Sequence, residues 1–238
     1  MRLKLHTRWN LTPRAAMRLQ EHLRERVVLE DHFGPLRLVA GADLAFDPET
    51  EVAVAGVIVY RYPELIEVER RMAHRKLRFP YIPGLLSFRE SPVLIAAFAR
   101  LRTEPDLILI DGHGRAHPRL FGIACHIGVV FDKPTIGCAK SLLVGEHAEP
   151  GRKTGATTPL MLRGEQVGTV LRTRSDVKPL YVTTGHRVSL ASAVEIVRNC
   201  CDGFRIPKPT READHFVREL RRELQRENQN RSNAIIAR

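Results

Sequence analysis

Short, almost purely apolar runs separated by amphipathic segments constrain the fold of this chain more than any other feature. The run at residues 51–60 is nearly continuous in β-branched and small apolar residues, and shorter runs follow at 106–110 and 134–139. Runs of this kind, without polar alternation, are typical of strands covered on both faces. The segments at 88–102 and 120–131 instead repeat apolar residues with the spacing of a helix. The pattern predicts an α/β fold with one mixed sheet flanked by helices.

The remaining segments complete this organisation. A first helix is predicted from Thr12 to about Asp31, because Thr12 can cap it and Pro13 fits its first turn. Further predicted elements are strands at 36–46, 65–76, 159–173 and 177–183, a helix from Ser189 to about Cys200, and a last helix from Pro209. The strand at 65–76 should pair antiparallel with the run at 51–60. We expect one domain over residues 1–225 and a disordered tail at 226–238.

Charge favours a polyanionic partner. The 238 residues include 38 Lys and Arg against 27 Asp and Glu, which gives a net charge of +11 and a pI near 10.1. Such a balance is typical of nucleic-acid-binding proteins, although on charge alone a basic protein without such a partner is an equal alternative.

Cellular location and cysteine state follow from what the sequence lacks. No run of about 18 apolar residues predicts a membrane span, and the first residues lack the apolar core of a signal peptide. We therefore expect a cytoplasmic protein with no membrane partner, and we expect it to be a monomer. Its four cysteines form no Cys-x-x-Cys pair, so reduced core thiols are expected.

Three acidic residues stand at informative places. Asp43 closes the apolar run 38–42, Asp111 ends the run 107–110, and Glu90 follows a Pro/Gly-rich block. Alone, each has an ordinary interpretation as a turn former, a helix cap or a helix-terminus charge. A carboxylate flanked on both sides by apolar residues, as Asp43 is, is costly unless it is paired or holds a metal. Together with the basic chain, the three acids predict Mg²⁺-dependent phosphodiester chemistry.

Several long motifs resemble the endonuclease V family. They occur in the family's order and span residues 12 to about 225: Gly41-Ala42-Asp43, Pro80-Tyr81-Ile82-Pro83-Gly84-Leu85-Leu86-Ser87-Phe88-Arg89-Glu90, Asp111-Gly112-His113-Gly114, His117-Pro118-Arg119, Pro134-Thr135-Ile136-Gly137-Cys138-Ala139-Lys140-Ser141 and Pro207-Lys208-Pro209-Thr210-Arg211. The resemblance implies a ribonuclease H-like fold and an endonuclease that uses Mg²⁺, for which Mn²⁺ can substitute. It also implies action on DNA containing deaminated adenine (hypoxanthine), with cleavage at the second phosphodiester on the 3′ side that leaves 3′-hydroxyl and 5′-phosphate ends.

The same resemblance suggests residue roles. Asp43 and Asp111 would be metal ligands and Glu90 would complete the cluster. Asp214 is a further candidate ligand, with a solvated helix-surface charge as the alternative. His117 and Lys140 match the remaining catalytic positions. A stiff loop that carries an aromatic residue is a good wedge for an opened base stack. The resemblance assigns this role to Pro80, Tyr81, Ile82 and Pro83, and a base pocket to Gly84, Leu86, Gly112, Gly122 and Ile123.

Other residues leave questions open. His113 stands where relatives more often carry an amide or a small residue, so it is a candidate for substrate contact. Basic residues near the loops are candidates for phosphate contacts: Arg75, Lys76, Arg78, Arg89, Arg115, Arg119, Arg152, Lys153, Arg205 and Lys208. Two alternatives to a DNA repair enzyme remain: an endoribonuclease on inosine-containing RNA, and a basic binding module whose acids are structural. Metal-dependent nicking separates an enzyme from a binding module.

Overall fold

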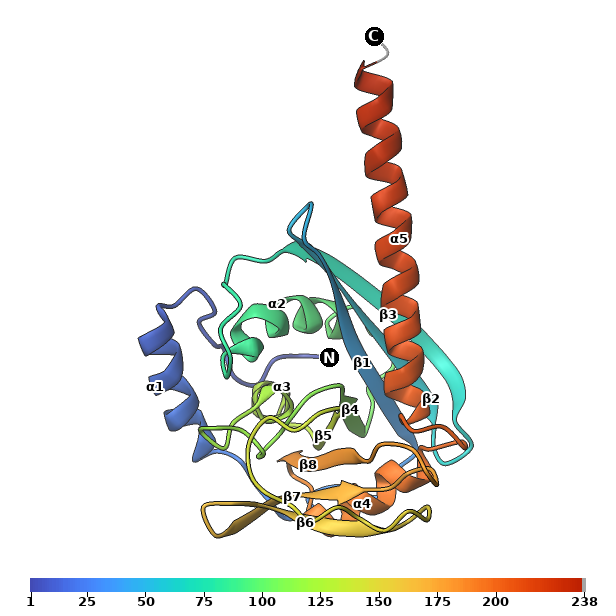
Figure 1. Cartoon of the computed structure of the whole chain (residues 1–238). Coiled ribbons are helices and arrows are strands. Elements are labelled where there is room, and N and C mark those ends of the chain that lie inside the picture. The colour runs from blue at the N-terminus through green and yellow to red at the C-terminus, as the bar shows by residue number, and fades with distance from the viewer. Residues whose placement is uncertain (237–238) are drawn as a thin grey trace.

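An eight-stranded mixed sheet organises the molecule (Figure 1). The structure, a computed structural model, describes residues 1–236. The strands lie in the order β3-β2-β1-β4-β5-β8-β7-β6. Their bounds are Leu38–Asp47 (β1), Val52–Arg61 (β2), Ile66–Lys76 (β3), Leu107–Ile110 (β4), Thr135–Ala139 (β5), Thr157–Leu162 (β6), Glu165–Leu171 (β7) and Leu180–His186 (β8). The helices are Pro13–Arg24 (α1), Leu86–Phe98 (α2), Ile123–Phe131 (α3), Leu190–Asn199 (α4) and Lys208–Ile236 (α5).

The centre of the sheet is parallel and its first three strands form an antiparallel meander. β1 pairs antiparallel with β2, and β2 pairs antiparallel with β3, as the sequence predicted. β4 lies parallel to both β1 and β5, and β5 pairs antiparallel with β8. Because β1, β4 and β5 are parallel neighbours, their carboxyl ends meet at one edge of the sheet.

Helices cover both faces of the sheet, so the central strands are buried on both sides. On one face, α2 and α3 form a core with β1, β2 and β4 that includes Phe98, Ile108 and Phe131. On the other face, α4 packs over β7 and β8, and the first turns of α5 pack over β1 and β2. The approach of α5 is close: a Cβ on Gly41 of β1 would lie 2.0 Å from the Pro209 carbonyl oxygen. Gly41 is therefore required for this packing.

Three predicted elements differ from the structure. The first helix ends at Arg24 rather than near Asp31. The predicted strand at 159–173 is two strands, because Arg163 and Gly164 adopt positive φ of 53° and 81° and turn the chain between β6 and β7. The backbone is helical to Ile236, where a disordered tail was expected.

Two expectations from composition can be compared with the described residues. None of the helices there is both long and apolar enough to cross a membrane. All four cysteines are free thiols, and Cys125, Cys138 and Cys200 are buried.

Candidate active site

The parallel strand ends bring the predicted acids together. Asp43 lies in β1, and its neighbour Ala42 is in register with Ile110, the last residue of β4. Asp111 follows directly, and Lys140 occupies the equivalent place after β5. The Lys140 ammonium forms an ion pair with the Asp111 carboxylate and lies 4.0 Å from Asp214 Oδ1. Three neighbouring strands thus contribute two acids and one cation to one edge of the sheet.

Asp214 joins this cluster from the opposite layer. It lies in the second turn of α5, the helix that packs closely over β1. Its carboxyl group shares a hydrogen bond with Asp43, and Arg218 Nη2 lies 3.0 Å from its Oδ1. Only 18% of its side chain is exposed, so the solvated-charge alternative does not describe its environment.

Burial disfavours the charged forms of the carboxyl groups in this cluster. Burial, followed by repulsion from Asp111, raises the pKa of Asp43 to about 8. Burial raises the pKa of Glu90 to about 7, against the opposing attraction of Arg89. Burial also raises the pKa of Asp111, although Lys140 opposes this shift. A site in which desolvated acids face one another is poised to accept a further cation.

A cavity of about 160 Å³ lies beside this cluster. All five predicted pocket residues line it: Gly84, Leu86, Gly112, Gly122 and Ile123. Small residues are required here. A Cβ on Gly122 would lie 2.2 Å from the His113 carbonyl oxygen, and Gly84 has a positive φ of 77°. We call this space the base cavity.

The predicted wedge residues form the rim of the base cavity. Tyr81, Ile82 and Pro83 line it, and the Tyr81 side chain is 70% exposed. Beneath the loop, Phe79, Leu85 and Phe88 are buried in a small core of their own. The loop therefore has a fixed base and an exposed aromatic tip.

The chain has counterparts in sequence and in fold among known proteins. The sequence model of endonuclease V matches residues 21–215. The chain belongs to the endonuclease V family. It is 48% identical over 210 residues to endonuclease V of Nostoc sp., covering 88% of this chain and 95% of the relative. Endonuclease V of Gloeobacter violaceus is 47% identical over 226 residues, covering 94% and 92%.

Solved structures agree with this assignment. Endonuclease V of Streptomyces avermitilis superposes with a TM-score of 0.87 at 41% identity, over 91% of this chain and 96% of that one. The Bacillus subtilis structure gives 0.90 at 32% identity, over 95% and 100%. The predicted ribonuclease H-like fold and the hydrolase class are thereby confirmed. Endonuclease V enzymes are metal-dependent nucleases.

The acid cluster suits a hard metal ion by its chemistry. Among the side chains that the structure describes, no three His, Cys, Asp or Glu already converge in a ligand arrangement. Lys140 pairs with Asp111 and lies 4.0 Å from Asp214 Oδ1. The donors are nevertheless carboxylate oxygens, which Mg²⁺ and Mn²⁺ prefer. Burial is the main cause of the raised pKa values of Asp43 and Glu90, and a bound divalent cation would favour the charged forms of both. The residues present therefore fit such an ion.

His117 lies with the base cavity rather than with the acids. Its Nε2 is 2.9 Å from the Gly84 carbonyl oxygen, and its Nδ1 accepts a hydrogen bond from the Arg119 backbone N–H at 3.2 Å. None of its hydrogen bonds within the described chain reaches a carboxylate. Burial lowers the pKa of His117 to about 4, so the ring is neutral at pH 7. In this endonuclease V, its visible role is to hold the loop that carries Gly84.

Gln20 is a contributor that the sequence analysis missed. Its Nε2 donates to the carbonyl oxygens of Gly84 and Phe121, both at 3.2 Å, and its Oε1 accepts from Arg119 Nε at 2.7 Å. Arg119 Nη2 also donates to Gly84 at 2.6 Å. One buried amide thus joins both walls of the base cavity. The available signal was a glutamine on the buried stripe of α1, between Ala16 and Leu23.

Proposed function

We propose that this endonuclease V is a Mg²⁺-dependent repair enzyme that recognises hypoxanthine in DNA and hydrolyses the second phosphodiester on the 3′ side. The products carry 3′-hydroxyl and 5′-phosphate ends, and Mn²⁺ can replace Mg²⁺. The observation that carries the proposal is a small cavity, rimmed by an exposed aromatic loop, beside a cluster of buried acids. That is the arrangement needed to extrude a base and to cut the backbone close to it.

A related structure supports the substrate class. Endonuclease V of Ciona intestinalis was solved in complex with a 23mer DNA containing an inosine followed by a ribo-adenosine. It superposes on 90% of this chain with a TM-score of 0.78 at 29% identity.

Recognition is assigned to the base cavity. Tyr81 would enter the base stack as the hypoxanthine leaves it, and the gap would be held open by stacking on the tyrosine ring. Backbone groups at Gly84, Gly112 and Ile123 would then meet the extruded base, where an N–H can bond the 6-oxo acceptor that adenine lacks. Because Gln20, Arg119 and His117 all bond the Gly84 carbonyl, this wall is fixed before the base arrives.

Cleavage is assigned to the strand-end cluster. Asp43, Asp111 and Glu90 would hold Mg²⁺, with Asp214 as a further oxygen donor. When bound, the ion supplies a Lewis acid for the phosphate and activates water. Lys140 orients the Asp111 carboxylate through their ion pair and carries the positive charge closest to it. As substrate enters, the same ammonium can contact a non-bridging phosphate oxygen.

Cleavage mapping tests the proposal. A duplex with one deoxyinosine, labelled at its 5′ end, should give with Mg²⁺ a single product that ends in a 3′-hydroxyl one nucleotide past the lesion. Adenine in place of hypoxanthine should lower the rate greatly, and Asp111→Asn provides the catalytic control. Release of the free base, or a cut on the 5′ side, would contradict the proposal in favour of a glycosylase or another nuclease.

An RNA substrate is the second candidate. The ribo-adenosine that follows the inosine in the Ciona complex shows that this relative binds a ribonucleotide on the 3′ side of the inosine. Matched inosine RNA and DNA strands in the same assay decide between them, since only contacts to the 2′-hydroxyl distinguish the two.

A further inference from the structure

A second, larger cavity adjoins the base cavity. Its volume is about 700 Å³, and it lies between the segment that follows β5 and the loop between β7 and β8. Its lining includes Lys140, Arg152, Arg172, Lys178, Tyr181 and Arg205. The two cavities share Ser141 and Leu142. Because Lys140 bonds Asp111, the acid cluster borders this space, which we call the Arg205 cavity.

The Arg205 cavity is positively charged. Five Lys and Arg side chains line it against two acids, Glu149 and Asp176. Both acids are already used: Glu149 pairs with Arg172, and Asp176 pairs with Arg152. Lys178 is exposed and forms no ion pair with any described residue. Lys178 can therefore contact an anionic ligand without giving up an existing partner, and the other four cations add to the positive charge around it.

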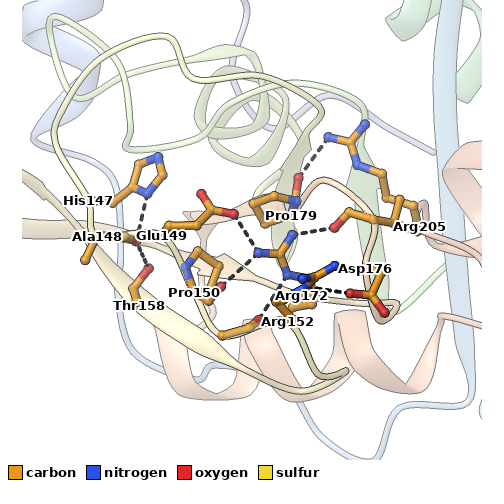
Figure 2. Close-up of polar contacts among 12 residues, drawn as sticks. His147, Ala148, Glu149, Pro150, Arg152, Thr158, Arg172, Asp176, Pro179 and Arg205 are labelled. Atoms are coloured by element: carbon orange, nitrogen blue, oxygen red, sulfur yellow. Dashed lines mark hydrogen bonds and ion pairs between the residues drawn. The ribbon is translucent and has the colours of Figure 1, made fainter.

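The walls of the cavity are held by a buried arginine. Figure 2 shows Arg172 reaching the 149–152 segment, with hydrogen bonds to the carbonyl oxygens of Gly151 at 3.1 Å and Pro150 at 2.8 Å. Arg172 also donates to Glu149 at 2.6 Å and to the Val177 carbonyl on the facing loop. It is only 6% exposed. Its bonds fix the two loops relative to each other, so the cavity is built before any ligand binds.

Arg205 links this cavity to the acid cluster. Its Nη2 donates to the backbone carbonyl of Lys140 and to that of Pro179 at 2.8 Å. Its charge opposes, as Lys140 does more strongly, the burial that raises the pKa of Asp111. The Arg205 Nε is buried and has no hydrogen-bond partner among the described residues. A guanidinium with an unused N–H beside the reacting centre suits a phosphate oxygen.

We propose that the Arg205 cavity binds the segment of the cleaved strand on the 3′ side of the cut, through its phosphodiester groups. This inference rests on the proposed function. With the lesion in the base cavity and the attacked phosphate at the acids, the strand continues past Lys140 into the adjoining space. Arg205 and Lys178 contact its phosphates, and Tyr181 offers a ring for a base or sugar. The volume is in the range of sites that hold ligands of nucleotide size.

Strand length on the 3′ side tests this inference. Two inosine duplexes share the same 5′ flank and the same complement, but the cleaved strand ends either one or several nucleotides beyond the cut. Wild type should have the higher kcat/KM on the longer strand. Lys178→Gln should reduce that advantage by roughly fivefold, as expected for one exposed charge contact. It should also lower the salt slope of binding by about 0.7 to 0.9, whereas Lys178→Arg should restore both.

Lys133→Gln is the charge control. Lys133 lies before β5 and pairs with Glu104 at 3.2 Å, so this substitution removes one positive charge at the end of β5 away from the Arg205 cavity. This variant should keep the wild-type ratio of the two rates. The inference would be overturned if Lys178→Gln and Lys133→Gln lost the kcat/KM advantage of the longer strand equally. It would also be overturned if wild-type cleavage did not depend on the length of the 3′ segment. Either result would leave the proposed function intact. Failure of wild type to cut either duplex would instead contradict the proposed function and the inference with it.

Discussion

Replacing Gln20 with methionine tests whether the base cavity is held in shape from outside, by α1. Methionine has nearly the length of glutamine and a similar helix propensity, so α1 itself should persist. The substitution removes two donated hydrogen bonds and one accepted bond. The Gly84 carbonyl keeps His117 and Arg119 as donors, whereas the Phe121 carbonyl loses the amide of Gln20.

The magnitude follows from these partners. A buried carbonyl left without a partner costs about 1–3 kcal/mol. Arg119 Nε loses a charge-assisted bond, but it is part-buried and water can replace much of the loss, so we add only about 1 kcal/mol. The free energy of unfolding should therefore fall by about 2–4 kcal/mol. Gln20→Glu should be no better, because its second carboxylate oxygen would face two carbonyl oxygens.

Urea unfolding and steady-state cleavage of an inosine duplex provide the assay. Arg18→Met, an exposed site on the same helix, is the control and should change stability by less than about 0.5 kcal/mol. With the enzyme folded, Gln20→Met should raise KM for the inosine duplex more than it lowers kcat, because the wall of the cavity is loosened and the acids are untouched. Stability and KM both at wild-type values would refute the bracing role of Gln20.

Three further predictions address the acids, the wedge and a buried histidine. Asp43→Asn and Asp111→Asn should each lower Mg²⁺-dependent cleavage by at least roughly a hundredfold with an unchanged circular dichroism spectrum; near wild-type cleavage would show that the residue is no ligand. Tyr81→Ala should weaken binding to inosine DNA by about 1–3 kcal/mol more than to undamaged DNA, and equal losses would favour a structural tyrosine. Burial lowers the pKa of His126 to about 3. Below pH 6.5 the histidine therefore binds a proton only in the unfolded chain, so the free energy of unfolding decreases as the pH is lowered. Between pH 7 and pH 5, wild type should lose about 2 kcal/mol more than His126→Phe in urea unfolding, and parallel pH profiles would contradict this.

The central fold and the acid cluster could be predicted because their signals are local. The apolar runs of β2, β4 and β5 are hydrophobic enough to mark buried strands whatever surrounds them. Once β1 and β4 are parallel neighbours, the register that opposes Ala42 to Ile110 brings Asp43 close to Asp111. Predicting that these acids lie together therefore required only the strand positions and the tendency of sites to form at the carboxyl ends of parallel strands.

The polar side chains that hold the cavity loops could not be predicted, because their hydrogen bonds join residues far apart in the sequence. Gln20 reaches partners 64 and 101 residues away, and no periodicity records such a pairing. Arg172 follows a strand, where an arginine is ordinarily expected in solvent, yet it is buried by the loops that it holds. The contacts of His117 could not be predicted for the same reason, since its motif indicates a polar position but not which loop its ring contacts.

These polar side chains all stabilise loops in the same way. The loops around both cavities are Pro- and Gly-rich or charged, so they contribute little apolar surface to hold themselves in place. Each is fixed instead by a polar side chain that bonds several backbone carbonyls: Gln20 and Arg119 at the base cavity, Arg172 and Arg205 at the Arg205 cavity. Carbonyl oxygens accept hydrogen bonds from any donor of the right geometry. A side chain that bonds them therefore fixes the path of the loop backbone without requiring particular side chains in the loop. The surfaces that would meet a nucleic acid can then vary in sequence while the distance between the base cavity and the acids stays fixed.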